Sequence, residues 1–149
     1  MNKYRSDQTI EPAAPAAAET MYSLLHAGRV VEERLEAALA DAELSLPKFT
    51  VLSLLAEADE PLTLSDIAGR MKCVRSNITQ LVDRLEADGL VRRVDHPNDR
   101  RAVHAALTPL GRDRQARGAE RVEAMQREFA AALSDGDAAI MLRIFRAIG

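Results

Sequence analysis

Residues 75–84 carry a run of side chains that can hydrogen-bond to the bases and phosphates of a nucleic acid. If this segment is a helix whose apolar residues face inward, the 3.6-residue repeat places its polar side chains on the opposite side. The inward set is Ile78, Leu81, Val82 and Leu85, and the outward set is Arg75, Ser76, Thr79, Gln80 and Asp83, with Asn77 and Arg84 at its edges. Arginine can pair with guanine, asparagine and glutamine with adenine, and hydroxyl groups with bases or phosphates. By itself, however, this pattern does not distinguish a DNA-binding face from a solvated one.

Arg100 and Arg101 form a second basic group, in the turn DHPNDRR between two strand-like segments at 90–94 and 102–107. These segments predict a β-hairpin with a basic tip. Such a tip can follow the narrow, electronegative minor groove of DNA without base-specific hydrogen bonds. An isolated arginine pair in a loop is usually solvated, but the position of this pair directly after the polar helix favours a DNA contact.

The order of the predicted elements indicates the fold. Apolar residues at three- and four-residue steps predict a helix over 17–40, and capping signals predict the helices that follow. These signals are Ser45 with Pro47, Thr63 with Asp66, Gly89 after a fourth helix over about 74–88, Thr108 with Pro109 before a long helix to about 132, and Ser134 with Asp137. A winged helix-turn-helix has this order: a helix, a short turn, a second helix and a hairpin. Its second helix lies in the major groove of DNA. The sequence therefore predicts a mainly α fold (α+β) with its recognition helix at about 74–88.

The predicted domain covers residues 17–149 and follows a flexible arm at 1–16 that lacks a periodic apolar pattern. Within the domain, residues 46–108 form the winged lobe, and helices in 17–45 and 109–149 flank it as a dimerisation region. The first and last helices carry apolar stripes that a monomer of 149 residues could not both cover. We therefore expect an obligate homodimer.

Composition excludes several other classes of protein. With 149 residues, 47% apolar and 29% charged, the chain is typical of one globular domain. Its single cysteine, Cys73, excludes an internal disulfide and a multi-thiolate zinc site. No apolar run approaches the roughly twenty residues needed to cross a bilayer, and the N-terminal segment is too polar for a signal peptide. We expect a cytoplasmic protein with no membrane partner.

The charge distribution favours an anionic partner, although the net charge of −3 does not. Residues 63–117 carry 11 basic and 7 acidic side chains, a local charge of +4, whereas residues 1–62 carry −6 and residues 118–149 carry −1. Apart from three lysines, all basic residues are arginines, which suit planar hydrogen bonding to phosphate and guanine. Double-stranded DNA is therefore the partner that the sequence favours.

Residues 63–112, TLSDIAGRMKCVRSNITQLVDRLEADGLVRRVDHPNDRRAVHAALTPLGR, resemble the MarR family of transcriptional regulators. The resemblance rests on the helix-to-strand segment LVDRLEADGLVRR, on a wing with Asp99 and Arg101 two residues apart, and on LTPLG at 107–111. By order of elements it extends over about 20–149, while the arm lies outside it.

The resemblance implies a homodimer with intertwined terminal helices, recognition helices in successive major grooves, and a wing arginine in the minor groove. In this chain Arg101 takes the wing role and Asp99 orients it. The chain departs from the family pattern at Lys72 and Val74, where glycine and serine are common, so the usual side-chain cap of the recognition helix is missing. The expected DNA-binding residues are Arg75, Ser76, Asn77, Thr79, Gln80, Arg84, Asp99, Arg100 and Arg101.

Cys73 has two interpretations. Free cysteine is among the most buried residue types, and the family usually has a small apolar residue at this position, so the first interpretation is core packing. The second is a redox switch, because Lys72, Arg75 and the following helix N-terminus would favour the thiolate. The three histidines are too scattered to indicate a metal site, and no cofactor motif or catalytic signature occurs. We expect no metal, no cofactor and no enzymatic activity.

Tyr22, His26 and Arg29 lie at i, i+4 and i+7 on one side of the predicted first helix. The resemblance places an effector site between the dimerisation helices and the DNA-binding lobe. An aromatic ring, an imidazole and a cation there would suit a small anionic or phenolic compound. The alternative is that Tyr22 packs in the dimer interface while Arg29 pairs with Glu32 or Glu33.

Taken together, the residues and the resemblance predict a ligand-responsive repressor that binds a pseudo-palindromic DNA site as a homodimer. An effector would release the DNA by changing the spacing of the two recognition helices. Two alternatives stay open, a regulator that senses oxidants through Cys73 and a winged-helix module that binds protein. Arg75, Gln80 and Arg84 favour DNA over a protein partner.

Overall fold

The computed structural model describes residues 17–58, 60–96 and 99–148, with the backbone alone at 96 and 99–102. The predicted arm at 1–16 lies outside the described residues. The described chain forms two units, one that ends at Val31 and one that begins at Glu32. The second unit contains every element discussed below except the first part of α1.

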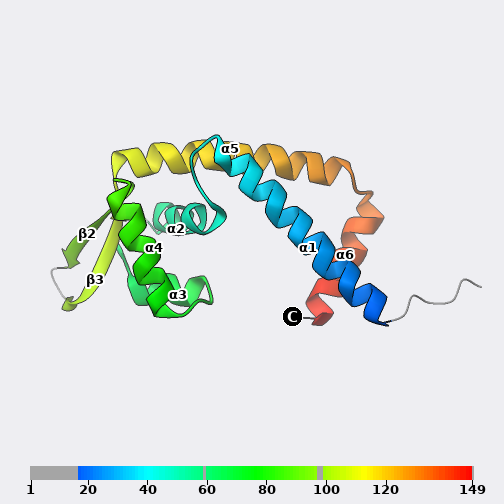
Figure 1. Ribbon diagram of the computed structural model, residues 1–149, viewed down its shortest axis with the longest axis horizontal. Helices are drawn as coiled ribbons and strands as arrows, with labels where there is room; N and C mark the ends of the chain where they lie inside the picture. The colour runs from blue at the N-terminus through cyan, green and yellow to red at the C-terminus, as the bar shows by residue number, and fades with distance from the viewer. Residues whose placement is uncertain (1–16, 59, 97–98, 149) are drawn as a thin grey trace, which may run out of the picture. The chain divides into compact units, whose positions relative to one another are not determined.

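Along the described residues the structure has six helices and a three-stranded antiparallel sheet (Figure 1). They are α1 (Ala17–Ala40), α2 (Leu46–Glu57), β1 (Leu62–Thr63), α3 (Leu64–Arg70), α4 (Arg75–Ala87), β2 (Val91–His96), β3 (Asp99–Leu107), α5 (Pro109–Ala131) and α6 (Asp135–Ile148). The predicted helices, the hairpin and the mainly α fold class are confirmed. None of the described helices has the length and apolar character that a membrane span requires. The division into subdomains at residues 45 and 109 stays a prediction.

The sheet contains a strand that the sequence pattern does not predict. β1 has only two residues and pairs antiparallel with β3, so that Leu62 is opposite Ala105 and Thr63 is opposite His104. β3 therefore lies between β1 and β2. A two-residue strand shows no alternation of apolar and polar positions, so periodicity could not reveal it.

Threonine side chains begin α3 and α5, as predicted. The Thr63 hydroxyl accepts a hydrogen bond from the backbone N–H of Asp66 (3.0 Å) and donates one to the Asp66 carboxylate (2.6 Å). The Thr108 hydroxyl accepts from the N–H of Gly111 (3.0 Å) and donates to the carbonyl of Gly89 (2.7 Å). Each cap satisfies a helix N–H group that would otherwise lack a partner.

The predicted side-chain cap of α2 is wrong. Ser45 occupies the position before the helix, but its side chain makes no capping hydrogen bond. The carboxylate of Glu36, near the end of α1, instead accepts from the backbone N–H of Leu46 (2.9 Å). A distant acceptor thus replaces the local one, and sequence spacing does not report such a contact.

The core lies where α2, α3, α4 and the sheet meet, and it places one face of α4 in contact with the rest of the lobe. Leu52, Ile67, Ile78, Leu85 and Leu90 are among its fully buried side chains. On α4 the predicted inward residues Ile78, Val82 and Leu85 are buried, and Leu81 is half-buried. α2 packs against α5, and Figure 1 shows α2–α4 and the hairpin on one side of the first half of α5.

The start of α5 lies so close to the residue after Gly89 that Gly111 has no room for a side chain. A Cβ atom at Gly111 would lie 1.9 Å from the carbonyl oxygen of Leu90, which is a backbone atom and cannot swing away. We expect Gly111→Ala to lower the free energy of unfolding by about 3 kcal/mol, near the upper end of the usual cost of overpacking. Urea denaturation measures this change.

Gly69→Ala is the matched control, because a Cβ atom at this helical glycine would meet nothing within 4 Å. It should be neutral or stabilise the protein by up to about 1 kcal/mol, through the higher helix propensity of alanine. A Gly111→Ala variant as stable as the parent would contradict the close approach of α5.

Candidate nucleic-acid interface

The outward side of α4 has a continuous polar surface. The helix begins after Val74, whose side chain does not cap it, as the sequence indicated. Six predicted DNA-binding residues lie on this helix, and we call them the polar face of α4: Arg75, Ser76, Asn77, Thr79, Gln80 and Arg84. All are exposed except Thr79, which is half-buried and whose hydroxyl donates to the carbonyl of Arg75 (3.1 Å). This face is open to a partner, but its contact with DNA stays a prediction.

The predicted wing residues lie at the start of β3. The backbone of Asp99 pairs with His96 of β2, which places Asp99, Arg100 and Arg101 at the tip of the hairpin. The side chains of these three residues lie outside the described part of the structure. The hairpin itself is therefore confirmed, while the roles of Arg101 and Asp99 stay predictions.

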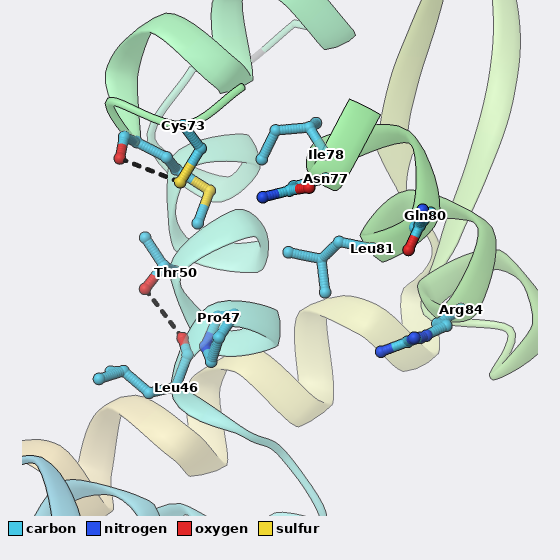
Figure 2. Close-up of a pocket in the computed structure, with 10 residues that line it drawn as sticks. Leu46, Pro47, Thr50, Cys73, Asn77, Ile78, Gln80, Leu81 and Arg84 are labelled. Carbon is cyan, nitrogen blue, oxygen red and sulfur yellow. Dashed lines mark hydrogen bonds between the residues drawn. The ribbon is translucent and has the colours of Figure 1, made fainter. Parts of the chain in front are cut away.

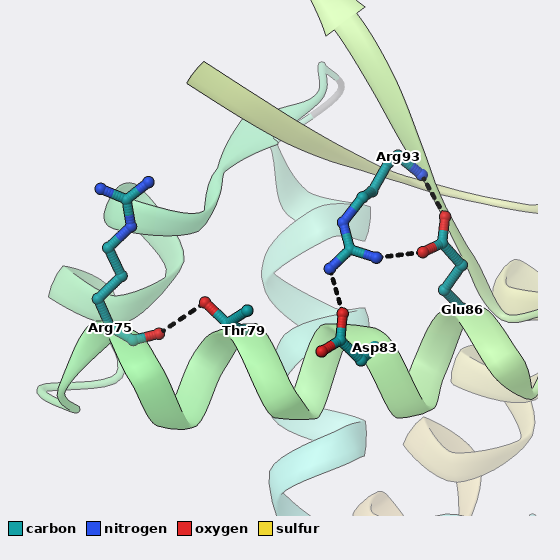
Figure 3. A network of polar contacts seen from close by, with 5 residues as sticks. All are labelled: Arg75, Thr79, Asp83, Glu86 and Arg93. Carbon is teal, nitrogen blue, oxygen red and sulfur yellow. Dashed lines mark hydrogen bonds and ion pairs between the residues drawn. The ribbon is translucent and has the colours of Figure 1, made fainter. Parts of the chain in front are cut away.

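A cluster of three charged side chains connects the hairpin to the recognition helix (Figure 3). The guanidinium group of Arg93, on β2, binds Asp83 with one terminal nitrogen and Glu86 with the other. The backbone N–H of Arg93 also donates to the carboxylate of Glu86 (3.1 Å). The hydrogen bond to Asp83 raises the pKa of Arg93 further above its already high usual value, although partial burial opposes this rise. We call these three residues the carboxylate–arginine cluster.

The helical repeat of the sequence places Asp83 on the outward face of the helix but does not identify Arg93. The available signal was the pair of carboxylates at i and i+3 near a helix end, followed by Gly89. Because this glycine has a positive φ of 72°, the chain turns there and β2 returns beside the end of α4. A basic residue early in that strand therefore lies within reach of both carboxylates.

A hollow of about 530 Å³ lies between the start of α2, the end of α3 and one edge of α4 (Figure 2). Its apolar wall consists of Leu46, Pro47, Met71, Ile78 and Leu81, and its polar residues are Thr50, Cys73, Asn77, Gln80 and Arg84. Three of these polar residues also belong to the polar face of α4. The hollow and the candidate DNA surface therefore share side chains.

The prediction that Cys73 packs in the core is wrong, because this residue is exposed. Cys73 lies in the turn between α3 and α4, so the inward face of neither helix extends to it. Its thiol donates to the carbonyl of Met71 (3.4 Å) and contributes to the hollow. The redox interpretation of Cys73 stays a prediction.

The three residues predicted to bind an effector all lie on α1, in the unit that ends at Val31. Tyr22, His26 and Arg29 are exposed. The helix that gives them a common side is confirmed, while their role in a ligand site stays a prediction.

The chain is similar to transcriptional regulators both in sequence and in structure. The family model described as "MarR family" matches residues 44–103. The chain is 33% identical over 89 residues to the uncharacterized HTH-type transcriptional regulator YsmB of Bacillus subtilis, and the match covers 60% of this chain. The matched part also spans only 60% of the length of YsmB.

Among the solved structures that are similar over nearly the whole chain are two that are 29% identical to it. Sco3205 of Streptomyces coelicolor, a MarR family transcriptional regulator in complex with DNA, gives a TM-score of 0.77 and covers 93% of this chain and 90% of its own. CouR of Rhodococcus jostii RHA1, bound to p-coumaroyl-CoA, gives a TM-score of 0.76 and covers 91% of this chain and 95% of its own. The winged helix-turn-helix arrangement is thus found in both.

The exposure of Cys73 has a direct chemical consequence. We expect this thiol to react with Ellman's reagent in the folded protein within about tenfold of its rate in urea, because exposed thiols are accessible to reagents. Cys73→Ser should lower the free energy of unfolding by less than about 0.5 kcal/mol, as is usual at exposed positions. A thiol that reacts only after denaturation would show that Cys73 is buried.

Proposed function

Because this chain belongs to the MarR family, we propose that it is a transcriptional regulator that binds double-stranded DNA through the polar face of α4 and the wing. The observation that carries the proposal is the exposed polar face on the second helix of the helix-turn-helix, next to the hairpin. Arg75 and Gln80 would contact base edges in the major groove, and Arg101 would enter the minor groove. The complex of the similar Streptomyces protein with DNA supports this assignment.

The DNA-binding form in this proposal is a homodimer. α6 exposes Ile140, Leu142, Ile144, Phe145 and Ile148, a set of large apolar side chains that water solvates poorly. A second copy of the chain would cover them and hold two recognition helices in a symmetric pair. Such a dimer fits half-sites whose centres are about 34 Å, or one helical turn, apart. We further propose repression, because a dimer across two successive grooves would block that DNA to other proteins.

The two arginine contacts should differ in kind. Arg75→Ala should reduce discrimination between the preferred duplex and unrelated DNA, while Arg101→Ala should weaken binding to most sequences, each by roughly 1 to 3 kcal/mol. Selection of bound duplexes from a random pool, followed by gel-shift titrations at several salt concentrations, measures both effects. The selected duplexes should contain two related half-sites. If both variants bind like the parent, the polar face of α4 and the wing are not the DNA-binding surface.

We also propose that a small molecule controls DNA binding, and the hollow beside α4 is a second candidate site besides Tyr22, His26 and Arg29. Its volume lies within the usual range for small-molecule sites, and it combines an apolar wall with few polar groups. Arg84 at its edge offers a charge-assisted hydrogen bond to a carboxylate or phenolate. CouR, with a ligand that is both phenolic and anionic, provides a parallel in ligand chemistry. An occupant would cover Asn77, Gln80 and Arg84 and so compete with DNA for them.

The single thiol of the chain serves as a reporter for this site. We expect naphthalene-2-carboxylate to slow the alkylation of Cys73 by iodoacetamide, because an aromatic acid in the hollow would cover the thiol. Arg84→Gln should raise the half-protecting concentration by about tenfold, the value of one charge-assisted hydrogen bond. The matched control Arg75→Gln removes the same charge from the same helix outside the hollow, and should leave protection unchanged. An alkylation rate that is independent of the acid would remove the hollow as an effector site.

A further inference from the structure

The carboxylate–arginine cluster lies on the side of α4 that carries part of the proposed DNA-binding surface. Arg75, Thr79 and Asp83 are at i, i+4 and i+8, so they follow one another along one side of the helix (Figure 3). Asp83 is about 12 Å from Arg75 along the helix axis, at a rise of about 1.5 Å per residue. A carboxylate is thus built into a surface that would face phosphates.

A carboxylate at this position is unfavourable for binding a polyanion. Asp83 and Glu86 would together place two negative charges near the DNA, and like charges repel over about 10 Å at ordinary salt concentrations. Arg93 adds one positive charge between them and reduces the net charge of the cluster from two negative charges to one. Its planar fork can reach both carboxylates at once, which the single ammonium nitrogen of a lysine cannot do equally well.

The cluster contributes little else that the fold requires. The side chains of Asp83, Glu86 and Arg93 are 55%, 39% and 31% exposed, and ion pairs at such positions add little to stability. The hairpin is held by the pairing of β2 with β3, and the contact of Glu86 with β2 uses the backbone N–H of Arg93. Replacing the guanidinium group would therefore leave the strand in place while exposing both carboxylates.

We propose that Arg93 is a positioning residue for DNA binding, which holds the carboxylates of Asp83 and Glu86 and screens their charge from the phosphates. The inference rests on the proposed function, since it requires that the polar face of α4 approach DNA. It assigns to Arg93 an action through its two partners on the helix rather than a direct contact with DNA. Asp83 and Glu86 in turn keep the guanidinium group in a fixed orientation.

The test compares the parent with five variants on one duplex that the parent selects from a random pool. Arg93→Gln should weaken binding by about fivefold near 50 mM salt, and the deficit should shrink to about twofold near 300 mM, because salt screens the exposed carboxylates. Asp83→Asn alone should not weaken binding. The double variant Arg93→Gln with Asp83→Asn has the same cluster charge as the parent and should bind within about twofold of it.

The fourth variant, Arg92→Gln, is the matched control. It removes one positive charge from the same strand, but adjacent residues of a strand point to opposite faces, so the cluster stays intact. Its deficit should be smaller than that of Arg93→Gln. Thermal melting monitored by circular dichroism confirms that each variant is folded. The fifth variant, Arg93→Lys, retains the charge, and its affinity for DNA should lie between those of the parent and Arg93→Gln.

Four results would overturn the inference. If Arg93→Gln binds like the parent, the cluster has no part in DNA binding. If the double variant binds as weakly as Arg93→Gln, Arg93 contacts DNA directly or acts only through structure. A binding deficit of Arg93→Gln that does not change with salt would lead to the same conclusion. Failure of the parent to bind any selected duplex would overturn the proposed function itself, and this inference with it.

Discussion

The arrangement of the lobe depends on the junction between the end of α4 and the start of α5, which consists of residues 88–90 and 108–111. Gly89 adopts a positive φ that ends the helix, and the carbonyl of Leu90 accepts a hydrogen bond from the N–H of Thr108 (3.1 Å). The Thr108 hydroxyl then caps α5 and donates to the carbonyl of Gly89. These contacts join the recognition helix, both strands of the hairpin and α5 at one place. Gly111 is part of this constraint, since any side chain there would meet the backbone of Leu90.

The elements of this junction were predictable because the signals are local. Gly89, Thr108 and Pro109 act on residues within one turn of themselves, so spacing along the sequence is sufficient to identify them. Ser45 shows where such reasoning fails, because the first N–H of α2 finds its acceptor on Glu36, which is ten residues away. β1 shows a second limit, since a strand of two residues is defined by its partner β3 rather than by its own pattern.

The candidate site was predictable in its outline and not in its contacts. The inward repeat of Ile78, Val82 and Leu85 is enough to define which residues of α4 face outward. The same repeat could not show that Asp83 is bound by Arg93, because that contact joins two elements across a turn. The burial of Cys73 was predicted from the average behaviour of cysteine, whereas its exposure follows from its place in a turn between two helices.

The shared residues of the hollow and the polar face of α4 impose a thermodynamic relation on the proposed regulator. If a ligand and DNA both require Asn77, Gln80 and Arg84, binding of either must weaken binding of the other by the same factor. This relation needs no change in the distance between two recognition helices, unlike an effector site on α1, which must act through a conformational difference. Direct competition would also operate within a single lobe, because the ligand and the DNA would contact the same side chains. The two sites therefore differ in mechanism: an occupant of the hollow displaces DNA from the side chains that it covers, whereas an occupant of the α1 site must favour a conformation that DNA does not bind.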